Sequence, residues 1–115
     1  MKTDRELLEL AARAAGYELN DFAENGAWAY QKGSEVDFYG ELPIFLWSPL
    51  TDDGDALRLA VKLSMSVDID EHEDSTYAYA GDQPRVYAME LWQGNKDAAT
   101  RRAIVRAAAA IGETL

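Results

Sequence analysis

The pattern of hydrophobic and polar positions predicts a helix at the start of the chain. Apolar residues recur there at helical spacing, at Leu7, Leu10, Ala11 and Ala14. Thr3 and Glu6 have the spacing of a capping box, and Gly16 has the conformational freedom that helix ends use. We therefore expect a first helix between Thr3 and Gly16. The polar segment 17–26 is expected to be a loop.

The alternation of apolar positions then changes to that of β-strands. AWAYQ (27–31) and SEVDFYG (34–40) each place large apolar residues at alternate positions, and Lys32-Gly33 between them suits a hairpin turn. We expect these two runs to pair. PIFLW (43–47) is apolar on both faces, so it is either a buried strand or an extended segment over the core.

The stretch WSPLTDDGDALRLAVKL (47–63) combines an acidic loop with a helical pattern. It does not match a calcium loop, because Gly54 in the sixth place leaves Pro49 and Ala60 where oxygen ligands are needed. No Gly-Lys-Ser/Thr follows, so the phosphate-loop pattern fails too. A helix start explains the stretch better. Ser48 or Thr51 can cap the helix, Pro49 suits its first turn, and three acids complement its positive end: Asp52, Asp53 and Asp55.

Beyond this helix the apolar period changes from about 3.6 to about 2 residues. The runs SMSVDID (64–70), STYAYA (75–80) and RVYAMELW (85–92) alternate as half-buried strands do, and EHED (71–74) and GDQP (81–84) separate them. We expect an antiparallel meander. A last helix follows, capped by Asn95 or Asp97 and ended by Gly112. Its runs of alanine predict close packing against a neighbouring helix.

Together these elements predict a single α+β domain over residues 1–115. Three helices are expected to pack on one face of a mainly antiparallel sheet, in the order α-ββ-α-βββ-α. The composition agrees, because 48% of the residues are hydrophobic and a chain of this size can bury one core. Trp28, Trp47 and Trp92 are expected to anchor the core or its edge.

The chain is strongly acidic, with 21 acidic against 11 basic residues and a formal net charge of −10. This charge repels the phosphates of nucleic acids and anionic membranes, so neither is an expected partner. A basic protein surface is the natural long-range partner. The absence of cysteine suits a reducing cytoplasm, and the sequence indicates neither a signal peptide nor a membrane span.

The densest charge lies in DIDEHED (68–74), which contains the only histidine. Carboxylates beside an imidazole can bind a divalent cation, but a hairpin tip without a second histidine is more typical of a solvated turn. Tyrosines on the neighbouring strands can form an exposed recognition face, since aromatic residues are enriched at interface hot spots. The candidate partner-binding residues are Asp68, Asp70, Glu71, Glu73, Asp74, Tyr77, Tyr79 and Tyr87.

No catalytic, cofactor-binding or metal-ligating residues are predicted. Nucleophilic catalysis lacks its parts, because the chain has one histidine, no cysteine and no Gly-x-Ser-x-Gly elbow. Arg101, Arg102 and Arg106 of the last helix have two interpretations. They form local salt bridges to the acidic segment 18–57, or they form a site for a small anion or an acidic protein.

Three blocks of the sequence carry a resemblance to known proteins. They are DRELLELAARAAG (4–16), WSPLTDDGDALRLAVKL (47–63) and ATRRAIVRAAAAIG (99–112). With them the chain resembles a family of small, uncharacterised proteins of tailed bacteriophages and prophages. Family members more often have Asn in place of Ser48, and both residues can cap a helix. The resemblance implies a phage origin and the cytoplasm of a bacterial host, but no assigned activity or functional residues.

We expect a non-enzymatic accessory protein, without a cofactor, that binds a host or phage protein and masks a basic, nucleic-acid-binding surface. Two alternatives stay open. One is a small-ligand-binding or enzymatic module of phage metabolism with a pocket between helices and sheet. The other is a self-assembling structural component that forms a homodimer through its tyrosine-bearing strands.

Overall fold

The computed structural model describes residues 1–80 and 86–115, and it confirms an α+β fold. The elements in the described residues are α1 (Asp4–Ala15), β1 (Tyr17–Ala23), β2 (Gly26–Gln31), β3 (Phe45–Trp47), α2 (Asp53–Lys62), β4 (Ser66–Asp70), β5 (Ser75–Ala80), β6 (Val86–Leu91) and α3 (Lys96–Glu113). The strands form two antiparallel sheets, a first sheet β1-β2-β3 and a second sheet β4-β5-β6. The turn expected at 81–84 lies outside the described residues.

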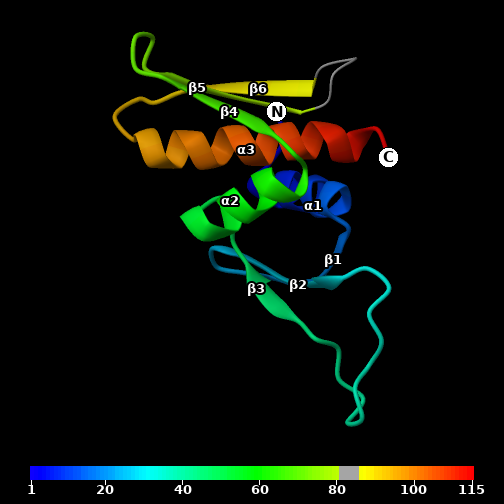
Figure 1. Ribbon diagram of the computed structural model, residues 1–115. Coiled ribbons are helices and arrows are strands. Elements are labelled where there is room, and N and C mark those ends of the chain that lie inside the picture. Colours follow the sequence, from blue (N-terminus) through cyan, green and yellow to red (C-terminus); the bar gives the residue numbers. More distant parts are fainter. Residues whose placement is uncertain (81–85) are drawn as a thin grey trace.

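The helices lie between the two sheets (Figure 1). Helix α3 packs on β5 and β6 of the second sheet, while α1 and α2 lie on the other side of α3. The first sheet follows α1 directly and lies on the side of the helices opposite to the second sheet (Figure 1). From the sequence we expect a single sheet with all helices on one face, and this part of the prediction is wrong. The meander forms as predicted, but β1, β2 and β3 pair with one another instead of joining it.

Small residues let α1 and α3 approach closely, as the alanine runs predicted. The alanines that these two helices bury in the shared core are Ala11, Ala12 and Ala15 of α1, and Ala103, Ala107, Ala108 and Ala109 of α3. A Cβ added to Gly112 would lie 1.9 Å from the carbonyl oxygen of Leu10. The prediction that Gly112 ends the helix is wrong, because α3 continues to Glu113. Gly112 is instead a contact point with α1.

Contacts between nearby residues start α1 and α3 where the sequence predicted. The Thr3 hydroxyl oxygen accepts a hydrogen bond from the backbone amide of Glu6, and the Glu6 carboxylate accepts one from the backbone amide of Thr3. This pair of bonds is the expected capping box. The Thr3 amide and the Thr3 hydroxyl both donate to the Glu6 carboxylate, and these two bonds favour its ionised form and lower the pKa of Glu6. Gly16 ends α1 in the left-handed conformation. Asn95 caps α3 by accepting the amide of Ala98.

The acidic stretch before α2 is a helix start, as predicted, but a different residue caps it. Asp52 accepts the amide of Asp55 at 2.8 Å, and α2 begins directly after this cap. Ser48 and Thr51, the predicted caps, lie before the cap position and make other contacts. The backbone amide of Ser48 donates to the Asp55 carboxylate, and the hydroxyl of Thr51 donates to the carbonyl of Asn25. The Asp55 carboxylate thus ties the approaching chain to the first turn of the helix.

Helix α3 also holds the entrance to α2. Arg101 donates to the carbonyl of Leu50 at 2.9 Å and to the Asp53 carboxylate at 2.6 Å. Pro49 is buried in the turn before α2 rather than in its first helical turn. The carboxylates of this stretch therefore serve the fold, as cap, loop acceptor and ion-pair partner.

The first sheet contains a strand that the sequence pattern concealed. Segment 17–26, expected to be a loop, forms β1 and the turn to β2. Leu19 pairs with Ala29 and Asp21 pairs with Trp28, so one extra residue between them forms a β-bulge. The bulge shifts the alternation of apolar residues by one position. A period of two residues is therefore lost in the sequence, although the strand is continuous.

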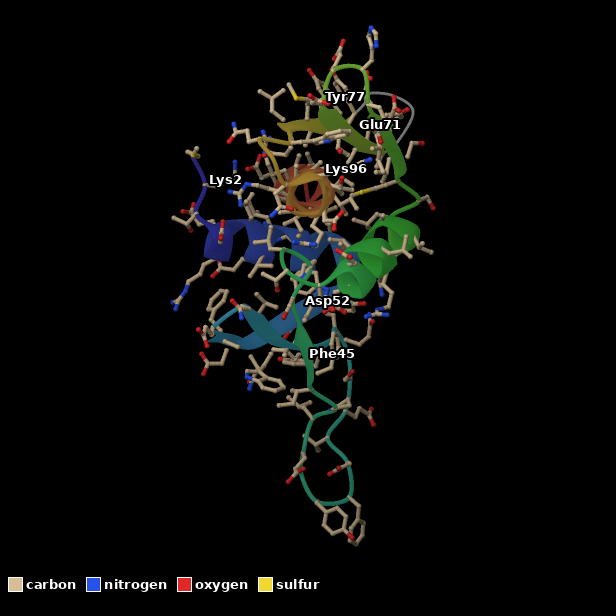
Figure 2. All side chains as sticks on the ribbon, turned by 90° about the vertical axis from the view of Figure 1, so that its left-hand side faces the viewer. Lys2, Phe45, Asp52, Glu71, Tyr77 and Lys96 are labelled. Atoms are coloured by element: carbon tan, nitrogen blue, oxygen red, sulfur yellow. The ribbon has the colours of Figure 1, made fainter. Side chains whose placement is uncertain are left out.

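Segment 34–40 was expected to be the second strand of a hairpin, and this prediction is wrong. Strand β2 pairs with β1 on one edge and β3 on the other, so neither edge is left for it. Residues 32–44 instead form an arm that extends away from the body (Figures 1 and 2). Asp37 closes the tip by accepting two backbone amides of the same turn, at 2.8 and 2.9 Å. Phe38 and Tyr39 at the tip are 95% and 83% exposed.

Candidate protein-binding face

The second sheet turns most of the predicted partner-binding residues to one side. In β5, Thr76, Ala78 and Ala80 are buried toward α3, which leaves Tyr77 and Tyr79 on the opposite side. The strand register places β4 and β6 residues of the same orientation beside these tyrosines. We call this side the outer face, and it consists of Ser66, Asp68, Asp70, Ser75, Tyr77, Tyr79, Tyr87, Met89 and Leu91.

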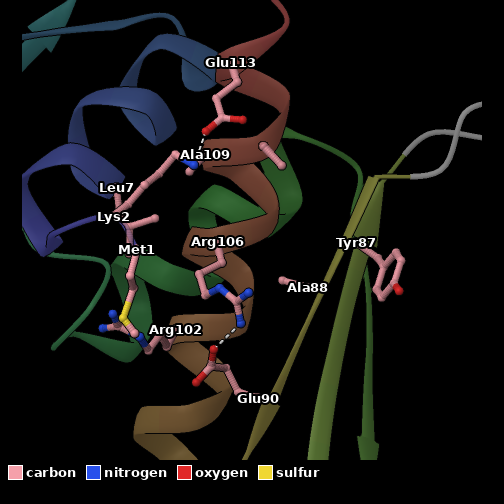
Figure 3. A pocket seen from close by; sticks show the side chains of 11 residues that line it. Met1, Lys2, Leu7, Tyr87, Ala88, Glu90, Arg102, Arg106, Ala109 and Glu113 are labelled. Carbon is pink, nitrogen blue, oxygen red and sulfur yellow. Dashed lines mark hydrogen bonds and ion pairs between the residues drawn. The ribbon is translucent and has the colours of Figure 1, made fainter.

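Several large apolar side chains of the outer face are exposed. The exposed fractions are 64% for Tyr87, 38% for Met89 and 54% for Leu91. Figure 3 shows Tyr87 on the opposite side of β6 from Arg106, which belongs to α3. Tyr77 and Tyr79 are half-buried because they lie on the middle strand between two neighbours. The outer face thus offers the aromatic and apolar area that protein interfaces bury.

The acidic residues of the β4–β5 hairpin have different positions. Asp68 lies on the outer face. Asp70 lies on the same side, and its carboxylate accepts two backbone amides of the turn at 2.9 and 3.2 Å, so it shapes the hairpin tip. Glu71 forms an ion pair with Lys96 of α3. Asp74 ends the turn in the left-handed conformation, with φ of 51°.

Glu73 connects the hairpin tip to the outer face. The phenol of Tyr77 donates a hydrogen bond to the Glu73 carboxylate at 3.1 Å. This bond and the nearby negative charge disfavour the tyrosinate, so the pKa of Tyr77 is raised. The structure therefore places five of the predicted residues on the outer face, namely Asp68, Asp70, Tyr77, Tyr79 and Tyr87, and Glu73 contacts this face through Tyr77. Glu71 and Asp74 lie at the tip, away from it.

Metal-ligand geometry is absent from the described part of the chain. No group of three or more His, Cys, Asp or Glu side chains among the described residues is placed to hold a metal ion. His72 is exposed in the turn that Asp70 closes. The acidic hairpin tip is instead engaged in turn hydrogen bonds and the ion pair with α3.

The arginines of α3 pair with nearby carboxylates. The pairs are Arg101–Asp53, Arg102–Asp4 and Arg106–Glu90. Arg102 and Arg106 also line a cavity of about 460 Å³ between α1, α3 and β6, where Lys2 pairs with Glu113 (Figure 3). Each of these side-chain cations has a carboxylate partner, so ion pairs account for the arginines without a bound anion. Of the three arginines, only Arg101 pairs with a carboxylate of the acidic segment 18–57, as expected, because Asp4 and Glu90 lie outside it.

Sequence reasoning missed the exposed apolar side chains at the opposite end of the molecule. Trp47 is buried and Trp92 is half-buried, as expected of core anchors. Trp28 differs, because it lies on the outer side of the first sheet, is 40% exposed and pairs with Leu46, itself 50% exposed. At the tip of the arm, the ring centroids of Phe38 and Tyr39 lie 5.4 Å apart, and the two rings contact each other (Figure 2). Phe38 alternates with Val36 as in a half-buried strand, so no local signal marked the tip of the arm as exposed.

Comparisons with known proteins add no relative to this description. No protein-family model matches the chain, and neither a curated protein nor a solved structure matches it. Among the described residues, no helix has the length and apolar character needed to cross a membrane. The candidate site therefore rests on the geometry and charge of the outer face.

Proposed function

We propose that the protein is a non-enzymatic binding protein whose outer face covers a basic surface of another protein. The strand register carries the proposal, because it places Tyr77, Tyr79 and Tyr87 on one side of the sheet with Asp68 and Asp70 along its edge. Aromatic side chains dominate the binding energy of many interfaces. Carboxylates at the border attract a basic partner and fix its orientation.

The charge of the whole chain supports the same kind of partner. A net charge of −10 speeds association with a positively charged protein and slows association with an anionic one. Surfaces that bind nucleic acid are rich in lysine and arginine. A nucleic-acid-binding surface of a host or phage protein, which this protein would mask, is therefore the partner that fits both the charge and the phage resemblance.

Three variants test this proposal against a partner captured from a bacterial lysate and then purified. Tyr87→Ala removes the most exposed aromatic ring of the outer face, and Asp68→Lys reverses a charge on the same face. Glu24→Lys is the matched control, because it makes the same change of charge in the exposed turn between β1 and β2. Affinities are measured by calorimetry at low and at high salt.

We expect Tyr87→Ala and Asp68→Lys each to weaken binding about tenfold, since hot-spot changes cost more than about 1 kcal/mol. Asp68→Lys should also reduce the salt dependence of binding, because one attractive charge is lost. Glu24→Lys should bind nearly as tightly as the unmodified protein. Equal affinities for both outer-face variants and the control would contradict the proposal.

A further inference from the structure

Among the residues that the structure describes, strand β4 has one edge with no strand beside it. Within the described residues, the sheet order is β4-β5-β6, and β4 pairs only with β5. The free edge of a sheet presents backbone N–H and C=O groups that can pair with another extended chain. At five residues, β4 is long enough to pair with a short added strand.

The helix-facing side of β4 is also poorly covered. Helix α3 packs on β5 and β6. Thr76 and Ala78 of β5 are fully buried, whereas Ile69 and Val67, their direct neighbours on β4, are 46% and 37% exposed. Paired residues of β4 and β5 differ this much in exposed fraction because the helices do not extend over β4. Two apolar side chains are left facing solvent on the inner side of the sheet.

An apolar groove lies beneath this edge. It has a volume of about 360 Å³ and lies between β4, α2 and α3. Val67 and Ile69 line it from the sheet, Ile104 lines it from α3, and Leu57 of α2 is 63% exposed at its side. Successive side chains of an extended chain point to opposite faces. A chain added beside β4 would therefore direct every second side chain into the groove.

The outer side of the same edge is acidic. Asp68 and Asp70 alternate with Val67 and Ile69 along β4, and both belong to the outer face. The remaining side chains of an added strand would lie beside these two carboxylates, where lysine or arginine is favoured and acidic residues are disfavoured. A second copy of β4 would place carboxylates against carboxylates. The charge pattern therefore favours a basic strand over self-pairing.

We propose that β4 and the groove beneath it accept an extended segment of the basic partner as a fourth strand. Its apolar side chains fill the groove, and its lysine or arginine side chains pair with Asp68 and Asp70. This inference rests on the proposed function and deepens it, because it states in which conformation the partner is bound. Backbone hydrogen bonds supply affinity in such strand addition, and the groove selects the side chains.

The probe for this proposal is a short, capped peptide of alternating lysine and valine. One control peptide has every backbone nitrogen methylated, which keeps the charge but removes all backbone donors, and another alternates glutamate with valine. Binding is followed by NMR at the amides of residues 66–70 and at the methyl groups of Leu57, Val67 and Ile104. Hydrogen exchange of the β4 amides is measured with and without peptide.

Two exposed residues of α2 provide a matched pair of variants. Leu57 lines the groove, whereas Val61, 70% exposed on the same helix, is not among its lining residues. We expect Leu57→Asn to weaken binding of the lysine–valine peptide about tenfold, in line with the loss of one buried aliphatic contact. Val61→Asn should leave the affinity unchanged. Both side chains are exposed in the free protein, so neither change should prevent folding.

Strand addition is supported if the β4 amides gain exchange protection, the N-methylated and glutamate peptides fail to bind, and Leu57→Asn binds weakly. It is overturned if the peptides perturb only Tyr77, Tyr87 and Met89 and bind equally with and without N-methylation. That result would leave the proposed function intact. Absence of binding by the lysine–valine peptide also overturns it, and the calorimetry of the captured partner then decides the proposed function separately. Concentration-dependent dimerisation that protects β4 without peptide would instead identify a second copy as the occupant.

Discussion

At the scale of single residues, glycines, which have no Cβ, determine how closely neighbouring segments approach. Gly112 of α3 faces the backbone of Leu10 at a distance that leaves no room for a Cβ. Gly26 at the start of β2 is equally confined, because an added Cβ would lie 2.3 Å from the Ser48 hydroxyl oxygen and 2.4 Å from the Trp47 carbonyl oxygen. Neither glycine is needed for a left-handed conformation, so both serve contacts between segments far apart in the chain.

Gly112→Ala tests this role, because two principles predict opposite signs. Helix propensity alone predicts stabilisation by about 1 kcal/mol, since alanine is the better helix former. Contact with Leu10 predicts destabilisation by about 2–3 kcal/mol, as in other overpacked cores. We expect destabilisation, measured by urea denaturation. Ala110→Gly on the same helix is the control and should cost about 1 kcal/mol through propensity. A more stable Gly112→Ala protein would contradict close packing of α1 and α3.

The Tyr77–Glu73 hydrogen bond makes a prediction about pH. The bond raises the pKa of Tyr77 above the ordinary value of 10.0, so its stabilisation is complete below that value and is lost as the pH rises through the raised pKa. Glu73→Gln removes the negative charge, and we expect Tyr77 to ionise at lower pH in this variant. The measurement is an NMR titration of the tyrosine ring carbons. Tyr30, whose pKa is raised by Glu18, should be unaffected and serves as internal reference. An unchanged Tyr77 midpoint would refute the role of Glu73.

At the scale of elements, pairing partners decide which segments become strands. The bulge between Leu19 and Asp21 hides β1 from a search for alternation, yet β1 pairs along nearly its whole length with β2. Segment 34–40 has the alternation but finds both edges of β2 occupied. The arm therefore keeps large rings in solvent and is held by the turn around Asp37.

The rings of the arm should contribute little to folding. Phe38 and Tyr39 contact each other but are almost fully exposed. Replacing both with serine should change the free energy of unfolding by less than about 0.5 kcal/mol, as for other surface substitutions. Leu8→Ala, at a position only 4% exposed, is the comparison and should cost about 3 kcal/mol. Urea denaturation measures both. A loss from the double variant similar to that of Leu8→Ala would mean that the arm packs against the body.

At the scale of the whole molecule, charge and shape act together. The protein is elongated, 53 × 32 × 24 Å, with the second sheet at one end and the arm at the other (Figure 1). Several of its ion pairs are at least partly exposed at both partners, namely Lys2–Glu113, Lys96–Glu71 and Arg102–Asp4, and exposed pairs contribute little to stability. Because the net charge is −10, negatively charged side chains repel one another across the molecule. We infer that net repulsion outweighs the individual ion pairs.

Salt should therefore stabilise the protein. Raising sodium chloride from about 20 mM to about 500 mM shortens the screening length several-fold and weakens the repulsion. We expect the melting temperature, followed by circular dichroism, to rise over this range. Sodium sulfate is not a suitable substitute, because it also strengthens apolar burial. A melting temperature that falls with sodium chloride would mean that the surface ion pairs outweigh the net charge.

Much of the candidate face could be predicted from the sequence. Alternation along β5 and β6 identified Tyr77, Tyr79 and Tyr87, because in a regular antiparallel ladder the period of two residues alone determines the side of the sheet. The acidic tip was less predictable. Glu71 turns toward Lys96 of α3, which lies 25 positions away along the chain, and no local pattern indicates that contact.

The sequence by itself determined the features that depend on neighbours within a few residues. These are the capping box at Thr3, the start of the last helix near Asn95, the alternation of the meander and the net charge, since caps and alternation involve contacts three or four positions apart or fewer. Only the tertiary structure decided the split into two sheets, the role of Gly112 and the uncovered edge of β4. Each of these features depends on contacts between segments that are far apart in the chain, and no local sequence pattern indicates such contacts.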